Sequence, residues 1–387
     1  MAKQKKINIS IILGTRPEAT KLAPVILELR AHPEQFNVEV IATGQHREML
    51  PQALGVFGIK PDVDLDIMLP KQSLEHITSA ALARLEEVFN ARKLDLILVE
   101  GDTTTVFAAS LAAFYHRVPV VHLEAGLRTD DSYSPFPEEI NRRLTSVLAS
   151  VHLAPTTAAR ANLLAEGHDR RKIYVTGNTA VDAVLWCAAQ PAPALPSVIE
   201  QAGKFILVTS HRRESWGEPL ARTCRALREI ARRFPEFPII YPVHPNPIVR
   251  QTADKILGKE KRVHLLDPLE YMPFVHAMKR AHLILTDSGG VQEEAPSLNK
   301  PILVLRDNTE RPEGLTAGTS RLVGTDSERI IAETTRLLTD EKAYNAMARA
   351  KNPFGDGRAA RRVREAILHY LGLRPRRPVD FNPSRGS

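Results

Sequence analysis

Residues 283–296 read LILTDSGGVQEEAP, and this stretch decides the fold class. Leu283–Thr286 predicts a buried strand, and Ser288-Gly289-Gly290 then opens a helix. The two glycines allow the backbone to approach a phosphate closely, and the first amides of the helix favour negative charge. Glu294, further along the helix, can accept hydrogen bonds from ribose hydroxyls. The stretch therefore predicts a nucleotide-binding strand–turn–helix unit, although a purely structural Gly-rich helix start has the same pattern.

The alternation of strand and helix continues in both directions along the chain. Short apolar runs are separated by segments with helical spacing, which is typical of parallel, doubly wound sheets. In the first half the runs are Ile7–Leu13, Val38–Thr43, Leu94–Val99 and Val118–Leu123. In the second half they are Phe205–Thr209, Ile239–Val243, Val263–Leu266, Leu283–Thr286 and Ile302–Leu305. The sequence therefore predicts an α/β protein made of two Rossmann-like, doubly wound domains.

The alternation is interrupted at Gln190–Pro196, QPAPALP, where the prolines cannot continue a helix. We therefore expect one domain over residues 1–186 and a second over 197–357, with a final helix at 358–371. The segment 374–387 is rich in Arg and Pro, and we expect it to be disordered. Ligands of doubly wound sheets bind beyond the carboxyl ends of the strands, so we expect a site in a cleft that the two domains face.

Composition indicates a globular protein. Of the 387 residues, 43% are hydrophobic and 25% are charged, and no apolar run approaches the ~20 residues that cross a bilayer. No uninterrupted apolar segment follows the basic start, and two cysteines form no disulfide framework, so we expect a cytoplasmic protein without a membrane partner. The net charge of +7 is compatible with a nucleic-acid surface, but aromatic residues are only 5% and no recognised binding motif is present. We expect no nucleic-acid partner.

In the first half, polar residues follow each predicted strand. Arg16 and Lys21 can both face an anion at the start of the first helix. The spacings GxxxxGK[ST] and GxGxxG are absent there, which argues against a nicotinamide or flavin cofactor. Asp102, Glu124 and Glu138 are acids at strand or helix ends. Two alternative roles stay open: Asp102 or Thr103 as the N-cap of the following helix, and Glu138 as a partner of the helix dipole.

Metal binding is the alternative at His122-Leu123-Glu124, which is similar to half of the zinc-deaminase motif. Its Pro-Cys-x-x-Cys partner is missing, so we expect no metal. In the second half, His211 and Arg212 in Ser210–Glu214 follow a strand and indicate an anion site, with a solvated basic turn as the alternative. His244 is fixed between prolines in Pro242–Pro247. Arg311 lies close enough in sequence to join the nucleotide unit.

Together these motifs resemble the non-hydrolysing UDP-N-acetylglucosamine (UDP-GlcNAc) 2-epimerases of bacteria. In order, they are GTRPEATKLAP, TGQHREML, VEGDTTTVFAASLAAFY, HLEAGLRT, SPFPEEINRRL, TGNTAVDA, SHRRESWG, YPVHPNP, LILTDSGGVQEEAPSLNKP, RDNTERPE and NPFGDG. The resemblance covers roughly residues 7–370. It implies a GT-B-like fold whose final helix packs back toward the first domain, and a homodimer.

The resemblance also implies reversible epimerisation at C2 between UDP-GlcNAc and UDP-N-acetylmannosamine (UDP-ManNAc), with no cofactor or metal. UDP leaves by anti elimination, giving 2-acetamidoglucal, and then re-adds; the product would supply ManNAc for surface polysaccharides. The catalytic residues so implied are Asp102, Glu124, Glu138 and His211. Those implied to bind the UDP-sugar are Arg16, Lys21, Phe274, Ser288, Gly289, Gly290, Glu294 and Arg311.

A second UDP-GlcNAc, as activator, is implied at Gln45, His46, Lys71, Glu138, Arg212 and His244. Lys71 stands where some members carry Arg, which keeps the charge but loses bidentate geometry. Three other classes stay open. A hydrolysing relative would release free ManNAc and UDP, a GT-B glycosyltransferase would need an acceptor, and a non-enzymatic nucleotide-sugar sensor or nucleic-acid binder would use the basic C-terminus.

Overall fold

The computed structural model describes residues 5–44, 49–69 and 72–384, and the chain separates into two compact units. Unit 1 comprises Met1–Ala183 and Gly355–Ser387, and unit 2 comprises Val184–Phe354. The chain therefore leaves unit 1 once and returns to it at the end. The first division lies before the Pro-rich segment that marked the expected boundary, inside the helix Thr179–Ala189 (α7).

Unit 1 is built on a seven-stranded sheet in the order β3-β2-β1-β4-β5-β6-β7, and all its pairings are parallel. Its strands are β1 (Ile7–Leu13), β2 (Phe36–Ala42), β3 (Val63–Asp64), β4 (Leu96–Glu100), β5 (Val120–Leu123), β6 (Val151–Ala154) and β7 (Ile173–Val175). The central strands are buried along their whole length because helices cover both faces, and their sequences are accordingly continuous apolar runs.

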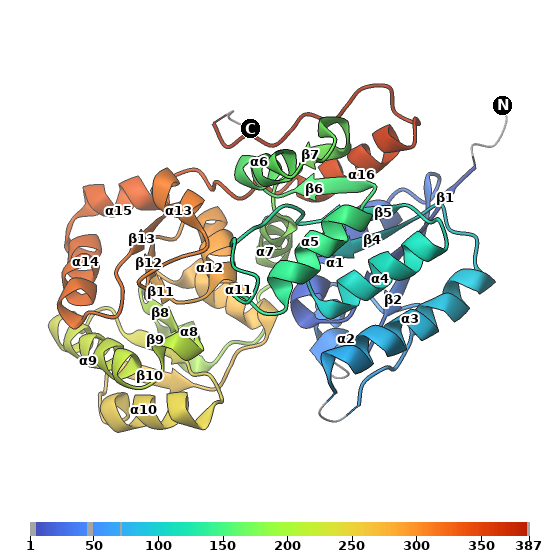
Figure 1. Ribbon diagram of the computed structural model, residues 1–387. Coiled ribbons are helices and arrows are strands. Elements are labelled where there is room, and N and C mark those ends of the chain that lie inside the picture. The colour runs from blue at the N-terminus through green and yellow to red at the C-terminus, as the bar shows by residue number, and fades with distance from the viewer. Residues whose placement is uncertain (1–4, 45–48, 70–71, 385–387) are drawn as a thin grey trace. The chain divides into compact units, whose positions relative to one another are not determined.

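The helices of unit 1 form two rows (Figure 1). One row contains α3 (Leu74–Ala91), α4 (Thr104–Tyr115) and α5 (Glu138–Leu148), and the other contains α2 (Met49–Gly55), α1 (Arg16–Arg30) and α16 (Ala359–Tyr370). A further helix, α6 (Thr157–Ala165), and the 3-10 turn η1 (Arg170–Lys172) precede β7. The last helix thus packs on the first, and Arg364 Nε donates to Glu28 Oε1 at 2.8 Å.

Unit 2 has a six-stranded parallel sheet in the order β10-β9-β8-β11-β12-β13, the Rossmann order 3-2-1-4-5-6. Its strands are β8 (Ile206–Thr209), β9 (Ile239–Pro242), β10 (Val263–Leu266), β11 (Leu283–Thr286), β12 (Ile302–Val304) and β13 (Ser320–Leu322). The α/β class and the two Rossmann-like sheets predicted from the sequence are confirmed.

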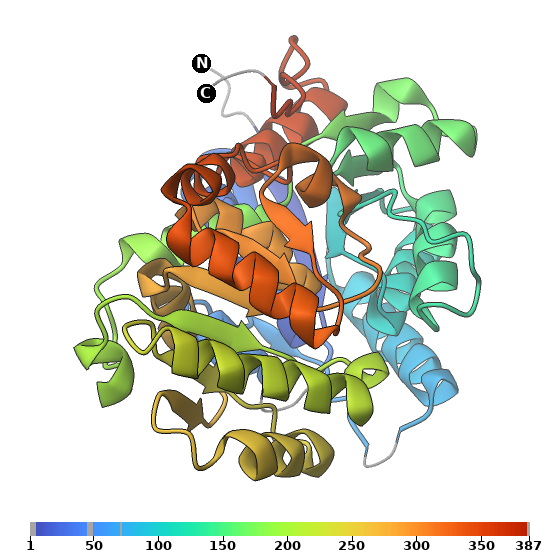
Figure 2. The same ribbon diagram turned by 90° about the vertical axis from the view of Figure 1, so that its left-hand side faces the viewer.

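The helices of unit 2 are α8 (Ser197–Gln201), α9 (Glu218–Arg233), α10 (Pro247–Leu257), α11 (Tyr271–Arg280), α12 (Gly289–Glu294), α13 (Pro312–Ala317), α14 (Ser327–Thr339) and α15 (Glu341–Ala348), with 3-10 turns η2 (Arg213–Ser215) and η3 (Ala295–Leu298). Figure 2 shows α10, α9 and α14 as neighbours in front of the sheet. Helix α9 turns Leu220, Cys224 and Leu227 toward the core at helical spacing. None of the helices formed by described residues is long and apolar enough to cross a membrane.

The C-terminal segment corrects one expectation. The structure describes it up to Ser384, and residues 377–381 contact β7, whereas the sequence predicted disorder from residue 374 onward. The Val175 amide donates to Asp380 Oδ1 at 3.0 Å, and the Phe381 amide donates to the Val175 carbonyl at 2.7 Å. The Phe381 ring is buried, and the Arg362 guanidinium lies over it. Because β7 is an edge strand, its backbone groups need partners, and the tail supplies them.

Candidate active site

A pocket of about 360 Å³ lies at the carboxyl ends of β1, β4 and β5 in unit 1. The strands β1 and β4 are neighbours from which the sheet continues in opposite directions, so this is the topological switch point where doubly wound sheets bind ligands. The charged residues in its wall are five carboxylates and one lysine: Glu18, Glu100, Asp102, Glu124, Glu138 and Lys21. The pocket therefore combines the three acids proposed for catalysis with a single cation among its described wall residues.

Lys21 lies between two of these carboxylates. Its Nζ is 2.6 Å from both oxygens of Glu124 and 3.1 Å from Oε1 of Glu100. Asn178 Nδ2 also donates to Glu124, at 3.2 Å. Burial raises the pKa of Glu100 well above its ordinary value, against the opposing charge of Lys21. One lysine thus faces two buried acids, of which Glu100 is driven toward its neutral form.

Glu124 occupies its position through an unusual backbone. It directly follows β5 and has a φ of 61°, in the left-handed region that non-glycine residues seldom adopt. His122, two residues earlier, is fully buried, and its Nε2 lies 2.7 Å from the Gly101 carbonyl. Burial lowers the pKa of His122 to about 4, so the ring is neutral at pH 7 and can donate this hydrogen bond from Nε2. His122 therefore supports the backbone immediately before Asp102.

Asp102 is not the cap of the helix that follows it. Thr103 occupies that place, and its side chain accepts from the Val106 amide at 3.3 Å. Asp102 instead accepts from Arg142 Nη2 of α5 at 2.6 Å. Burial raises the pKa of Asp102, and the Arg142 charge opposes that rise. The capping alternative for Asp102 is therefore wrong, and its carboxylate is available in the pocket.

Glu138 begins α5, where a carboxylate also suits the helix dipole. Its Oε2 is buried and accepts no hydrogen bond from the residues that the structure describes. Glu18 is in contrast fully engaged, because it accepts from the Gly14 amide at 2.7 Å and from Thr15 Oγ1 at 3.0 Å. Glu18 therefore holds the turn after β1, while Glu138 keeps a free acceptor in the pocket wall.

The turn after β1 also explains the glycine at its start. A Cβ on Gly14 would lie 2.5 Å from Thr43 Oγ1 and 2.6 Å from Thr105 Oγ1, so a larger residue would collide with both. Arg16, the first residue of α1, is not among the residues that line the pocket, whereas Lys21 is. The structure thus brings Lys21 to the three predicted acids but leaves Arg16 outside the wall.

The second group of predicted residues lies in unit 2, at the carboxyl ends of β8 and β11. Asp287 is fully buried there, and its Oδ2 accepts from the backbone amides of His211 and Arg212 at 2.8 and 3.0 Å. Its Oδ1 lies 3.2 Å from His211 Nδ1. Burial raises the pKa of Asp287, but the hydrogen bonds from His211 and Arg212 outweigh it and lower that pKa. Asp287 therefore orients the His211 ring as an ionised partner.

The glycine turn that opens α12 is flanked by guanidinium groups. A Cβ on Gly289 would lie 3.6 Å from Arg212 Nη2 and 3.8 Å from Arg311 Nη2. Ser288 caps α12 and accepts from the Val291 amide at 3.5 Å. Arg311 is itself held by the Glu293 carboxylate through Nε. The turn thus combines close backbone access, helix amides and two cations, which suits a diphosphate.

Other predicted residues of unit 2 lie on neighbouring elements. Glu294 ends α12 and accepts from the Tyr271 hydroxyl at 3.3 Å, and Phe274 follows Tyr271 on α11. The ring of His244 is stacked against that of His211, with centroids 6.0 Å apart. Gln45, His46 and Lys71 lie outside the described residues. Within residues 5–44, 49–69 and 72–384, no group of three or more His, Cys, Asp or Glu side chains could hold a metal.

Sequence reasoning missed the side chains that support the predicted ones. Glu100, Arg142 and Asp287 were present in the quoted motifs but received no role. Position at a strand end is a signal for two of them: Glu100 lies two residues before Asp102, and Asp287 directly precedes Ser288. No local pattern indicates that Arg142, in the middle of a helix, reaches Asp102.

Comparison with known proteins agrees with this geometry. Residues 27–368 match the family model for UDP-N-acetylglucosamine 2-epimerase. The UDP-N-acetylglucosamine 2-epimerase of Bacillus subtilis (strain 168) is 52% identical over 379 residues, which cover 97% of this chain and 99% of that protein. The structure of a putative UDP-N-acetylglucosamine 2-epimerase from Listeria monocytogenes is 47% identical, with a TM-score of 0.92 and coverage of 98% and 100%.

A UDP-GlcNAc 2-epimerase from Neisseria meningitidis, whose structure was solved bound to UDP-GlcNAc, is also similar. It is 48% identical with a TM-score of 0.84, over 94% of this chain and all of that one. Both the matched length and the identity exceed what a shared fold alone would give. On this evidence, the chain belongs to the UDP-N-acetylglucosamine 2-epimerase family.

Proposed function

We propose that this protein reversibly converts UDP-GlcNAc to UDP-ManNAc by inversion at C2, without hydrolysis of the product. The observation that carries the proposal is the pocket in unit 1, where Asp102, Glu124 and Glu138 line one wall with Lys21. Inversion requires proton transfer on both faces of C2, hence more than one acid or base. The three carboxylates, which lie in different surroundings, can provide these acid and base groups.

The first chemical step is the anti elimination of UDP. The C1–O bond breaks, its electron pair leaves with UDP, and a carboxylate takes the C2 proton to give 2-acetamidoglucal. UDP then re-adds at C1 while a proton is delivered to the opposite face of C2. A C2–H bond is weakly acidic, so negative charge must develop early on the leaving diphosphate.

Unit 2 offers the groups that stabilise a leaving diphosphate. Arg212 and Arg311 flank Gly289, and the amides that open α12 lie at the same turn. His211, oriented by Asp287, can donate to the departing phosphate oxygen. Preorganised donors of this kind stabilise charge as it forms in the transition state. Glu294 and Phe274 are proposed to contact the ribose and the uracil.

NMR of the products in D2O tests the proposal. UDP-GlcNAc incubated with the pure protein should give UDP-ManNAc that carries deuterium at C2, because the abstracted proton exchanges with solvent. Free ManNAc with UDP would instead identify a hydrolysing enzyme. Product that requires an added acceptor would identify a glycosyltransferase. UDP-ManNAc that retains its original C2 hydrogen would contradict elimination with solvent exchange.

A second UDP-GlcNAc is proposed as an activator. Arg212 and His244 lie in unit 2 beside His211, and Glu138 lies in the pocket wall of unit 1. Sigmoidal initial rates at low UDP-GlcNAc, and hyperbolic rates in His244→Ala, would support this role. Hyperbolic rates in the native protein would exclude it. We also propose a cytoplasmic location and a role in supplying ManNAc units for surface polysaccharides.

A homodimer is proposed through the exposed face of α5. Ile140, Leu144 and Val147 recur there at helical spacing, and Val147 is 76% exposed. Light scattering should give twice the 43.0 kDa chain mass for the native protein. Val147→Glu should lower it toward the monomer, while Leu164→Glu on α6, also exposed, should not. A monomeric native protein would contradict the proposal.

A further inference from the structure

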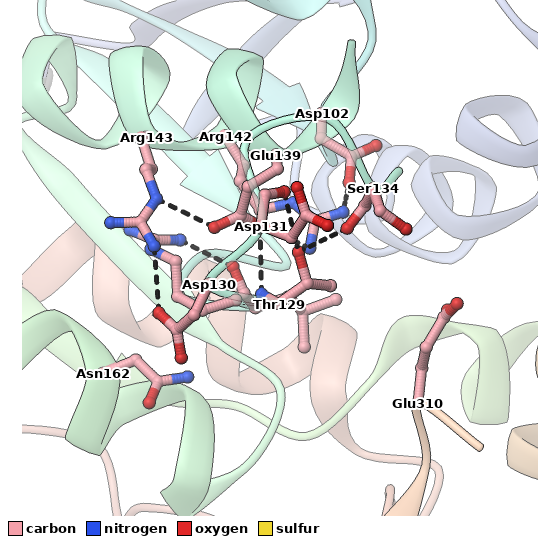
Figure 3. A network of polar contacts seen from close by, with 12 residues as sticks. Asp102, Thr129, Asp130, Asp131, Ser134, Glu139, Arg142, Arg143, Asn162 and Glu310 are labelled. Atoms are coloured by element: carbon pink, nitrogen blue, oxygen red, sulfur yellow. Dashed lines mark hydrogen bonds and ion pairs between the residues drawn. The ribbon is translucent and has the colours of Figure 1, made fainter. Parts of the chain in front are cut away.

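Arg142 joins the proposed catalytic pocket to a buried carboxylate behind it (Figure 3). It lies on α5, is buried, and is not itself among the residues that line the pocket. Its Nη2 donates to Asp102 Oδ2 at 2.6 Å, and its Nη1 lies 3.4 Å from Glu139 Oε2. One guanidinium group therefore faces two acids, one in the pocket wall and one in the protein interior.

Glu139 fixes Arg142 from the interior side. Its carboxylate is fully buried and accepts from the Thr129 amide at 3.1 Å and from Arg143 Nε at 2.8 Å. Thr129 in turn donates from its hydroxyl to the Ser134 carbonyl at 2.6 Å. The carboxylate of Glu139 thus holds both the guanidinium that faces Asp102 and the loop that leads to Glu138.

We propose that Arg142, anchored by Glu139, is a positioning residue for the epimerisation: it holds the Asp102 carboxylate in one orientation beside a fixed positive charge. This inference rests on the proposed function, in which Asp102 exchanges a proton with C2. A guanidinium suits the role better than an ammonium group because its planar fork directs one N–H at each acid.

The charges around Asp102 give the direction of the expected effect. Glu124 after β5, Glu138 on α5, and burial itself all favour the neutral acid, whereas Lys21 on α1 and Arg142 favour the carboxylate. Removal of the Arg142 charge should therefore raise the pKa of Asp102. The limb of the kcat–pH profile that reflects the titration of Asp102 should therefore move to higher pH. This direction holds whether Asp102 donates or accepts the proton.

The experiment compares Arg142→Gln and Arg142→Lys with Arg143→Gln in the full-length protein. Arg143 is the next residue of α5 and pairs with Glu139, Asp130 and Glu166, but it makes no contact with Asp102. It is therefore a matched control for the loss of an arginine from the same network. The measurements are kcat, KM for UDP-GlcNAc, UDP affinity and the kcat–pH profile.

We expect Arg142→Gln to lower kcat roughly 10- to 100-fold, as a displaced reacting group would, with UDP affinity unchanged. Its profile should move to higher pH. Arg142→Lys should keep the limb closer to its native pH, because the charge is retained, yet remain slow because the fork is lost. Arg143→Gln should leave the limb in place.

The inference would be overturned if the Asp102 limb of the kcat–pH profile kept its native position in both Arg142 variants. It would also be overturned if Arg143→Gln moved that limb as far as Arg142→Gln does. If Arg142→Gln does not fold, the kcat of Arg142→Lys decides, because a native kcat in that variant would overturn the inference. A parallel Asp102→Asn variant tests the proposed catalytic role of Asp102 separately from the positioning role of Arg142. Near-normal turnover in Asp102→Asn would remove Asp102 from the proposed mechanism, whereas an inactive Asp102→Asn beside a native limb in Arg142→Gln would remove Arg142 alone.

Discussion

The carboxylate of Asp287 binds both the backbone and the ring of His211. Oδ2 accepts from the His211 amide at 2.8 Å, and Oδ1 lies 3.2 Å from Nδ1 of the ring. A buried acid that binds the backbone of a histidine and lies within ion-pair distance of its ring restricts the orientation of that ring. The other ring nitrogen, Nε2, is thereby left to act on a ligand.

We expect Asp287→Asn to lower kcat by about 100-fold or more, because it removes the negative charge that faces the His211 ring. UDP affinity should fall much less. Asp267→Asn, at an exposed carboxylate of the same unit, is the control. Parallel losses of kcat and UDP affinity in Asp287→Asn would indicate a collapsed turn instead of a reoriented histidine.

Each of the three pocket acids should be needed for turnover. Asp102→Asn, Glu124→Gln and Glu138→Gln should each slow the reaction by about 100-fold or more, as expected when an acid or base is lost. UDP affinity, measured by calorimetry, should change little because most of the residues proposed to bind UDP lie in unit 2. Glu87→Gln on the exposed side of α3 should behave as the native protein. Near-normal rates in all three variants would place the chemistry elsewhere.

Glu294 should contribute to UDP binding. Its replacement by Ala removes an acceptor for the ribose hydroxyls and should weaken UDP binding by about 1–3 kcal/mol. Tyr271→Phe separates ribose binding from support of the Glu294 side chain, since Tyr271 donates to Glu294 at 3.3 Å. An unchanged dissociation constant in Glu294→Ala would remove this residue from the nucleotide site.

Asp182 should make the stability of unit 1 depend on pH. It accepts from the Ala359 and Ala360 amides at 3.1 and 2.9 Å, and burial raises its pKa to about 6. Since the folded state binds this proton more tightly than the unfolded chain, the contribution of Asp182 to the free energy of unfolding decreases as pH rises from about 4 to about 6. Over that range the stability difference between native protein and Asp182→Asn should fall by about 3 kcal/mol. Chemical denaturation at pH 4, 6 and 8 measures it, and a constant difference would contradict the assignment.

The C-terminal segment should contribute to the stability of unit 1. Phe381 is buried, so Phe381→Ala should lower the free energy of unfolding by about 3 kcal/mol. Val379 lies two residues earlier and is 69% exposed, so Val379→Ala should have little effect. Equal stabilities for the two variants would show that the tail does not pack on β7 in solution.

The fold was predictable where the apolar runs were continuous. Ile7–Leu13 and Leu283–Thr286 were predicted with the bounds that the structure shows, because buried parallel strands leave continuous apolar sequence. Four other strands were missed: Val63–Asp64, Val151–Ala154, Ile173–Val175 and Ser320–Leu322. Two of them, β3 (VD) and β13 (SRL), span only two or three residues and include polar ones, and β6 (VHLA) contains a buried histidine, so these three lack a continuous apolar run.

The site was predictable as far as strand ends indicate it. Asp102, Glu124 and the Ser288–Gly290 turn were selected because they follow strands, and the structure places them at the carboxyl ends of the two sheets. The partners of these residues were not predictable. Arg142 reaches Asp102 across 40 residues and Asp287 reaches His211 across 76, and such pairings arise only when the chain is folded.

The tail was misjudged for a related reason. Its composition resembles that of a disordered segment, yet Arg377 donates to the Ile173 and Arg171 carbonyls and its guanidinium lies over the Tyr174 ring. Composition indicates whether a segment folds in isolation. Here the adjacent strand β7 supplies the hydrogen-bond and packing partners that order the segment. These contacts also engage Arg377, one of the basic residues that the composition made a candidate for nucleic-acid binding.

The docking of the tail on β7 has a consequence for solubility. An uncovered strand at the edge of a sheet is a template on which other chains can add strands and aggregate. In this protein Asp380, Phe381 and Arg377 occupy backbone groups of β7 that would otherwise be open to such pairing. Truncation before residue 377 should therefore promote self-association through the sheet, even under conditions in which the shortened chain remains folded.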